Sequence, residues 1–206
     1  MKTLSLKGTH NVKKPRIVIA VAVLISLIAG CSKKTDESKN QSQQQNAAPA
    51  GAANVTTVAG VHWTVPQGWE AQGERPMRAA TYTVPSPKEG IKAGECGVFY
   101  FGNGQGGTVE DNLNRWISQF ERGGKHEFSS RQVNGMKVTT ITISGSYLSP
   151  AGPNMESQGK EDNYRLLGAI VEAPQGLVFF KFVGPAETVQ THQPDFDGLV
   201  NSIAKD

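Results

Sequence analysis

The chain has 206 residues, of which 37% are hydrophobic and 19% charged, and its formal net charge is +3. Five of the 21 basic residues lie within the first 16 positions, so the remainder carries 16 basic residues against 18 acidic ones. With a net charge of about −2 outside this leader, charge gives no support for binding to nucleic acid or to anionic lipid.

The first thirty residues have the layout of an export signal. Positions 1–16 are basic and contain no acidic residue, and positions 17–28 are aliphatic except for Ser26. The small residues Ala29 and Gly30 then precede Cys31. A basic segment, an apolar segment and a small-residue cleavage site form a secretory signal. Spanning a bilayer takes roughly 20 apolar residues, so a permanent transmembrane helix is the weaker interpretation.

Cys31 sharpens this prediction. The run Leu27-Ile28-Ala29-Gly30-Cys31 resembles the lipobox of bacterial lipoproteins. The resemblance implies that the thiol receives a diacylglycerol, that residues 1–30 are removed, and that the chain is anchored in the cell envelope, on the periplasmic face or the cell surface. Two or more fatty chains anchor a protein stably where one does not. The alternative is an ordinary signal peptide that happens to be followed by a cysteine.

Residues 31–54 are expected to be a linker between the lipid and a domain. This stretch is rich in Ser, Lys and Gln and then in Ala, Pro and Gly, and it contains no aromatic residue. Such a composition cannot bury enough apolar surface to offset the entropy lost on ordering. Its expected reach is roughly 25–30 Å.

Residues 55–206 read as one domain of mixed elements. Thr108 is a candidate N-cap, with Asp111 three residues later, and Asn134-Gly135 is a strong hairpin signal. The final helix is indicated by the apolar spacing of Phe196, Leu199, Val200 and Ile203. Strands are predicted over 61–65, 78–84, 95–101, 127–133, 136–147, 164–173 and 177–183, and helices over 108–122 and near 196–203. The fold class is therefore α+β, an antiparallel sheet of about six or seven strands flanked by helices.

The start Trp63-Thr64-Val65-Pro66-x-Gly68-Trp69, the central helix, the paired hairpins and the final helix together resemble the PsbP-like α/β/α sandwich. Members of that family serve as binding or assembly factors in unrelated settings, so the resemblance implies a fold and no particular activity. It assigns no functional residue.

The sequence Gly102-x-Gly104-x-x-Gly107 matches a dinucleotide fingerprint, because it lies between a predicted strand and a predicted helix. A dinucleotide site also needs a parallel β-α-β unit, whereas the following strands are hairpin-linked. A plain turn is the favoured interpretation, and binding of a generic anion is the second.

Catalytic and metal-binding signatures are weak. The histidines of residues 55–206 are widely separated, and Cys96 is the one cysteine left after Cys31, so it is expected to be a small buried hydrophobe without a disulfide partner. No Gly-x-Ser-x-Gly pattern is present. We therefore expect no cofactor and no metal.

Three hypotheses of function remain open. The first is a non-enzymatic module that binds or assembles a protein partner, and the second is a binder of small molecules or cell-wall components. An unrecognised hydrolase is the third. A binding surface would use Trp63 and Trp69, the aromatic residues expected to be partly exposed, or the glycines Gly104, Gly106 and Gly107. The other aromatics are expected in the core, with Phe179 and Phe180 on opposite faces of one strand.

Overall fold

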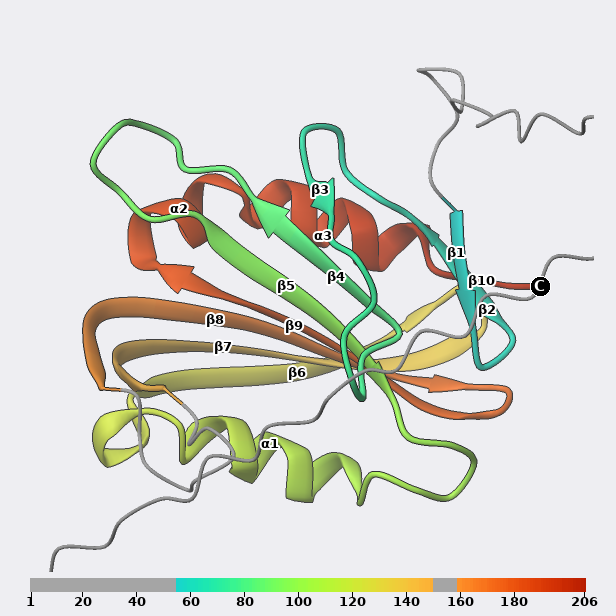
Figure 1. Cartoon of the computed structure of the whole chain (residues 1–206). Helices are drawn as coiled ribbons and strands as arrows, with labels where there is room; N and C mark the ends of the chain where they lie inside the picture. Colours follow the sequence, from blue (N-terminus) through green and yellow to red (C-terminus); the bar gives the residue numbers. More distant parts are fainter. Residues whose placement is uncertain (1–54, 150–158) are drawn as a thin grey trace, which may run out of the picture. The chain divides into compact units, whose positions relative to one another are not determined.

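The computed structural model describes residues 55–149 and 159–206 (Figure 1). The predicted signal over 1–30, Cys31 and the linker up to residue 54 lie outside the described residues, as does most of the loop after residue 149. Within the described part, no helix is long and apolar enough to cross a membrane.

An antiparallel sheet of seven strands forms the centre of the domain, in the order β3-β4-β5-β9-β8-β7-β6 (Figure 1). Its β6–β7 turn is the two-residue Asn134-Gly135 hairpin, in which both residues have positive φ. The strands are β3 (Glu70–Ala71), β4 (Ala80–Val84), β5 (Gly94–Tyr100), β6 (Lys125–Val133), β7 (Met136–Leu148), β8 (Lys160–Ala173) and β9 (Gly176–Pro185).

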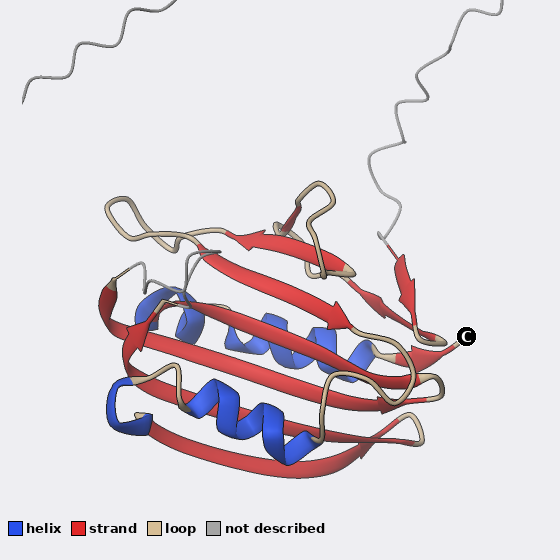
Figure 2. Ribbon diagram, turned by 60° about the horizontal axis from the view of Figure 1, so that its bottom comes forward, coloured by secondary structure: helices blue, strands red, loops and turns tan. Residues whose placement is uncertain are grey.

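Helices cover both faces of this sheet (Figure 2). The helix α1 (Val109–Ile117), followed by the short 3-10 turn η1 (Glu121–Gly123), packs on one face with Ile141, Ile143 and Phe179. The helices α2 (Ala186–Thr191) and α3 (Gln193–Ser202) pack on the other face, which contains Phe180. Because side chains alternate along each strand, the sheet contributes residues to two separate cores, one on each face. The predicted α+β sandwich and the opposed positions of Phe179 and Phe180 are confirmed.

A second sheet of three strands closes the core under α3. It has the order β1-β2-β10, from β1 (Val55–Val58), β2 (Val61–Thr64) and β10 (Ala204–Lys205). From β2, the Trp63 ring meets Phe180 edge-on with 5.0 Å between centroids. Because β10 pairs with β2, the first and last strands of the described domain lie in the same sheet. The sequence did not predict β1, β3, β10 or α2.

Candidate functional site

A pocket opens between α1 and the sheet, with a volume of about 260 Å³. Its walls come from α1 and the turn after it, from the end of β5 and from β9, and from the loop before β4. It is lined by Arg78, Phe99, Phe101, Asn112, Arg115, Trp116, Gln119, Phe179 and Lys181. The lining combines three cationic side chains with four aromatic ones.

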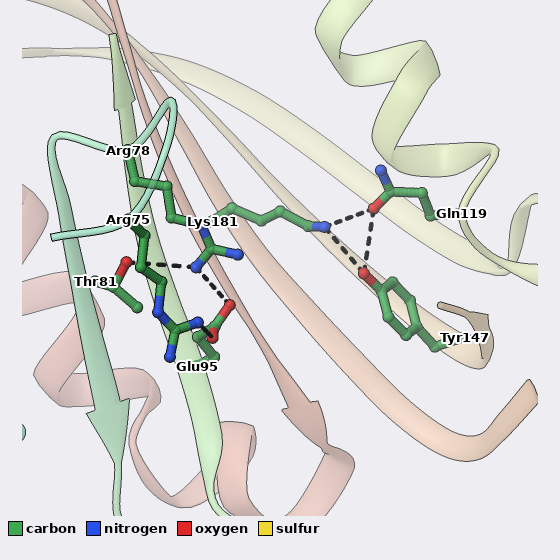
Figure 3. Close-up of polar contacts among 7 residues, drawn as sticks. All are labelled: Arg75, Arg78, Thr81, Glu95, Gln119, Tyr147 and Lys181. Atoms are coloured by element: carbon green, nitrogen blue, oxygen red, sulfur yellow. Dashed lines mark hydrogen bonds and ion pairs between the residues drawn. The ribbon is translucent and has the colours of Figure 1, made fainter. Parts of the chain in front are cut away.

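Lys181 forms the floor of the pocket. Because it lies two residues from Phe179 on β9, its side chain points to the face covered by α1. Its Nζ donates to Oε1 of Gln119 at 2.6 Å and to the hydroxyl of Tyr147 at 3.0 Å (Figure 3). It also lies 5.3 Å from the centroid of the Tyr147 ring. Within the described residues, no carboxylate lies within ion-pair distance of this ammonium.

Lys181 is part-buried, and the electrostatics of the floor follow from this position. The pKa of Lys181 is lowered to about 8, mainly by desolvation and also by the nearby charge of Arg78, while Glu95 partly offsets both effects. Burial likewise raises the pKa of Tyr147 to about 12, with a smaller contribution from the charge of Glu95. The phenol therefore stays protonated at neutral pH. Near pH 7 the floor carries a positive charge that two neutral oxygens hold in place.

Arg78 forms one side of the pocket and is fixed by an ion-pair cluster. Its Nη1 donates to Oε1 of Glu95 at 2.7 Å, and its guanidinium lies 5.3 Å from the centroid of the Phe99 ring. Arg75 donates to the other oxygen of Glu95 at 2.8 Å (Figure 3). One carboxylate thus serves two guanidinium groups, and the cluster keeps a net positive charge.

Arg115 lies exposed at the rim, on α1. Its Nη1 donates to Oδ1 of Asn112 at 3.1 Å, and it makes no ion pair with any carboxylate in the described part of the chain. Asn112 is itself fixed, because its amide donates to the carbonyl oxygens of Gly106 and Thr108 at 2.8 Å each. The loop before α1 therefore positions Arg115 through Asn112.

Aromatic rings form the rest of the lining. Phe99 stacks on Phe101 with 6.4 Å between centroids and 17° between planes, and Phe101 lies 5.8 Å from Phe179. Trp116 is buried against the sheet above Gly168, where a Cβ atom would lie 2.3 Å from Cζ3 of the indole. A glycine at position 168 is thus what lets the indole lie this close to β8. Together, these rings and cations can hold an anionic group on an apolar body.

The two tryptophans of the predicted binding surface lie in the core, so the expectation that they are partly exposed is wrong. Trp63 is 0% exposed and Trp69 7% exposed. Trp63 Nε1 donates to the hydroxyl of Tyr82 at 3.1 Å, and Trp69 packs on Phe182. The turn around Pro66 and Gly68 does not expose the two tryptophans, because both rings pack in the apolar core beneath α2 and α3.

The glycine-rich segment forms the loop between β5 and α1, where Gly102, Gly104, Gly106 and Gly107 all have positive φ. The strand after α1 is β6, which three strands separate from β5, so the arrangement differs from a dinucleotide-binding unit. A shallow recess of about 430 Å³ includes Gly104 and Gly107, and its lining contains Glu172 but no lysine or arginine. Ligand binding at Gly104, Gly106 and Gly107 stays a prediction.

Sequence reasoning missed the pocket because its cations come from three distant segments. The available signal was a lysine in the aromatic run Phe179-Phe180-Lys181-Phe182 of a strand predicted to be covered on both faces. Cys96 is fully buried, as expected, and its burial raises the pKa of the thiol. Within residues 55–149 and 159–206, no three His, Cys, Asp or Glu side chains are grouped to hold a metal ion.

No protein-family model matches this sequence, and no curated protein is similar to it in sequence. Among solved structures, the fold is similar to the solution structure of cyanobacterial PsbP (CyanoP) from Synechocystis sp. PCC 6803. The two are 16% identical, the match covers 79% of this chain and 99% of that one, and the TM-score is 0.44. A second similar structure is PA94, a protein of unknown function from Pseudomonas aeruginosa, at 10% identity, 72% and 93% coverage, and a TM-score of 0.39.

Proposed function

We propose that this protein is a non-catalytic, lipid-anchored protein of the bacterial cell envelope whose domain binds a small organic anion. The ligand would be a carboxylate with an apolar, preferably aromatic, body. This is the second of the three hypotheses from the sequence, with the binding surface moved from Trp63 and Trp69 to the pocket beneath α1.

The observation that carries this proposal is the part-buried ammonium of Lys181, which has no carboxylate partner among the described residues but faces a pocket. An unpaired buried charge is costly, and proteins usually pair such a charge or let it titrate. An anion in the pocket would supply the missing partner. Arg115 at the rim presents a guanidinium that suits the planar, two-oxygen geometry of a carboxylate.

The size and walls of the pocket favour a small ligand over a large one. Its volume of about 260 Å³ lies just below the usual range for small-molecule sites, which begins at roughly 300 Å³. Phe99 and Phe101 are stacked, and Phe101 is tilted against Phe179. An aromatic ring of a ligand could pack on these rings in the same offset or tilted geometry.

The experiment uses benzoate as the probe for the full chain in detergent, followed by calorimetry and by the fluorescence of the tryptophans. Benzoate is expected to bind with a Kd of about 1 mM or below. Benzamide, which has the same ring but no charge, and acetate, which has the charge but no ring, are expected to bind at least tenfold more weakly, because each loses one class of contact.

Two pocket variants complete the test. Arg115→Gln and Lys181→Met are each expected to weaken benzoate binding by about tenfold, since a hydrogen bond to a charged group is worth about 1.5–3 kcal/mol. Lys137→Gln removes an exposed cation on β7 outside the pocket and serves as the matched control. Equal binding of benzoate and benzamide, or unchanged affinity in both pocket variants, would overturn the proposal.

A further inference from the structure

The strand β6 is an edge strand that is exposed along almost its whole length. Among the described strands it lies at the end of the seven-stranded order, next to β7 alone, and eight of its nine residues are exposed. The exception is Val133, at the hairpin. An exposed edge of this length without proline is a template for pairing with another strand.

The register of the hairpin decides which backbone groups face the free edge. In a two-residue hairpin the flanking residues, Val133 and Met136, form a hydrogen-bonded pair. Odd-numbered residues of β6 therefore direct their N–H and C=O groups to β7. The groups of His126, Phe128, Ser130 and Gln132 are directed outward, ready for the ladder of a further strand.

The side chains of β6 differ between its two faces. Phe128 lies opposite Ile141, on the face that α1 covers, and it is 64% exposed, one of the two large hydrophobic residues so exposed in the described part. Glu127 and Arg131 lie on the other face, at equal distances from Ser129 along the strand.

This pattern is complementary to itself when two strands run antiparallel about a two-fold axis through Ser129. Each Glu127 then lies opposite an Arg131, and the two Phe128 rings become diagonal neighbours within reach of each other. A two-fold axis at Phe128 would instead place Lys125 opposite Arg131, and an axis at Glu127 or Arg131 would place like charges opposite. Among axes through residues 127–131, the one through Ser129 alone creates opposite-charge pairs.

We infer that two copies of this protein associate through β6, with Glu127 pairing with Arg131 across the interface and the two Phe128 rings in contact. The two seven-stranded sheets would then form one continuous antiparallel sheet. The interface is isologous, as expected of a two-fold dimer, and it covers the exposed edge of each copy.

A single introduced cysteine tests the position of the axis. In the full chain, Ser129→Cys is expected to form a disulfide-linked dimer under mild oxidation, because directly opposed Cα atoms of a non-hydrogen-bonded pair lie about 4.5 Å apart. Gln132→Cys on the same strand is the matched control. Its two copies would lie six residues apart along the strands, roughly 20 Å, and should not link above the wild-type background.

Charge exchange tests the pairing. Sedimentation of the full chain in detergent is expected to show a dimer that Glu127→Arg or Arg131→Glu weakens by about tenfold and that the double variant restores, because only the single changes oppose like charges. Glu89→Arg, an exposed loop residue, makes the same charge change as a control. A monomer at all concentrations, equal linking at Gln132→Cys, linking of Ser129→Cys to another protein, or failure of the double variant to restore the dimer would overturn the inference.

Discussion

Lys181 lies between Phe180 and Phe182, yet its side chain enters the opposite core from theirs, because successive residues of β9 alternate in direction. Its aliphatic stem packs among aromatic rings, and its ammonium has two neutral hydrogen-bond acceptors. The fall in pKa from 10.5 to about 8 corresponds to about 3 kcal/mol disfavouring the charged form. Because a charged lysine at this position lowers the stability of the fold, its presence suggests that position 181 has a function.

Lys181→Met should therefore raise the free energy of unfolding at pH 7, by about 1–3 kcal/mol, because an apolar side chain of similar length replaces a buried charge. Between pH 8 and 10.5 the unfolded wild-type chain binds the Lys181 proton and the folded chain does not, so wild-type stability rises with pH. The difference in the free energy of unfolding between the variant and the wild type should therefore shrink as the pH rises from 8 to 10.5. Urea unfolding at pH 7 and pH 10 measures the gap.

Cys96 and Tyr147 also titrate at high pH, and both have a raised pKa in the folded protein, so both lower stability as pH rises above their unfolded values. The Cys96 contribution is common to wild type and variant and cancels in the gap. Tyr147 contacts Lys181, so the gap is also measured in a Tyr147→Phe background, which removes the Tyr147 contribution. Lys137→Met, at an exposed position, should change stability by at most about 0.5 kcal/mol at either pH. A Lys181→Met protein less stable than wild type at pH 7, with a gap independent of pH, would refute this account.

The opposed directions of Phe179 and Phe180 could be predicted, because they depend only on the two-residue period of a strand. The partners of Lys181 could not. Gln119 and Tyr147 come from segments 62 and 34 residues away in sequence, and nothing local marks them as neighbours. The two-residue repeat of a strand predicts which face of the sheet a side chain lies on. The neighbours that the side chain meets there depend on how distant elements pack.

At the scale of elements, α1 was predicted well at its start and poorly at its end. The cap is as expected: Asp111 N donates to Oγ1 of Thr108 at 3.1 Å, and Thr108 N donates to Oδ2 of Asp111 at 3.0 Å. The apolar spacing favoured a helix that continued through Phe120, but α1 ends at Ile117. Phe120 is extended and bridges to Tyr147 of β7, so a tertiary contact overrides the local pattern.

The packing of α1 on the sheet gives a prediction at Gly168. In Gly168→Ala the new Cβ would lie 2.3 Å from Cζ3 of Trp116, so the indole must move and α1 must shift with it. The expected loss in the free energy of unfolding is about 1–3 kcal/mol, as for other overpacked core positions. Benzoate binding should weaken as well, because Trp116 lines the pocket. Chemical denaturation and calorimetry measure the two effects.

Gly198→Ala on α3 is the matched control, because a Cβ there meets nothing within 4 Å. This change should leave stability equal or raise it by up to about 1 kcal/mol, since alanine favours a helix more than glycine does. A Gly168→Ala protein as stable as wild type, with unaltered benzoate binding, would show that the indole does not depend on the missing side chain.

The shortest elements escaped prediction for a different reason. The strands β3 and β10 have two residues each, too few for any period, and they exist because partners are in place. In β10, Ala204 lies opposite His62 of β2, a residue from the far end of the domain. Such elements result from the completed fold, so their local sequences carry little signal.

For the whole molecule, the sandwich was predictable because the central strands of its sheet are apolar on both faces while its helices are apolar on one. Val138 packs in one core, and Ile141 and Ile143 pack in the other. The alternation of even and odd positions along β7 can be read from the sequence. The pocket was not predictable, because it exists only where the loop before β4, the strand β9 and the helix α1 converge. Local periods thus determine the layers, and the connections determine the site.

The anchor is the remaining whole-molecule prediction, and the two cysteines of the chain allow a matched test. The protein extracted from membranes should have an intact mass that lacks residues 1–30 and includes fatty chains on Cys31. Each buried methylene of such a chain contributes about 0.8 kcal/mol, so two chains hold the protein firmly. Cys31→Ala removes the acceptor thiol and should retain residues 1–30 without lipid.

Cys96→Ala is the control for this measurement, because the Cys96 thiol is fully buried and lies in the domain. This variant should be processed and lipidated as the wild type is, with a loss of stability of about 1 kcal/mol from the smaller side chain. A wild-type mass that includes residues 1–30 and no lipid would remove the anchor from the proposal. The pocket beneath α1 would be unaffected, because every residue that lines it lies in the domain after residue 54.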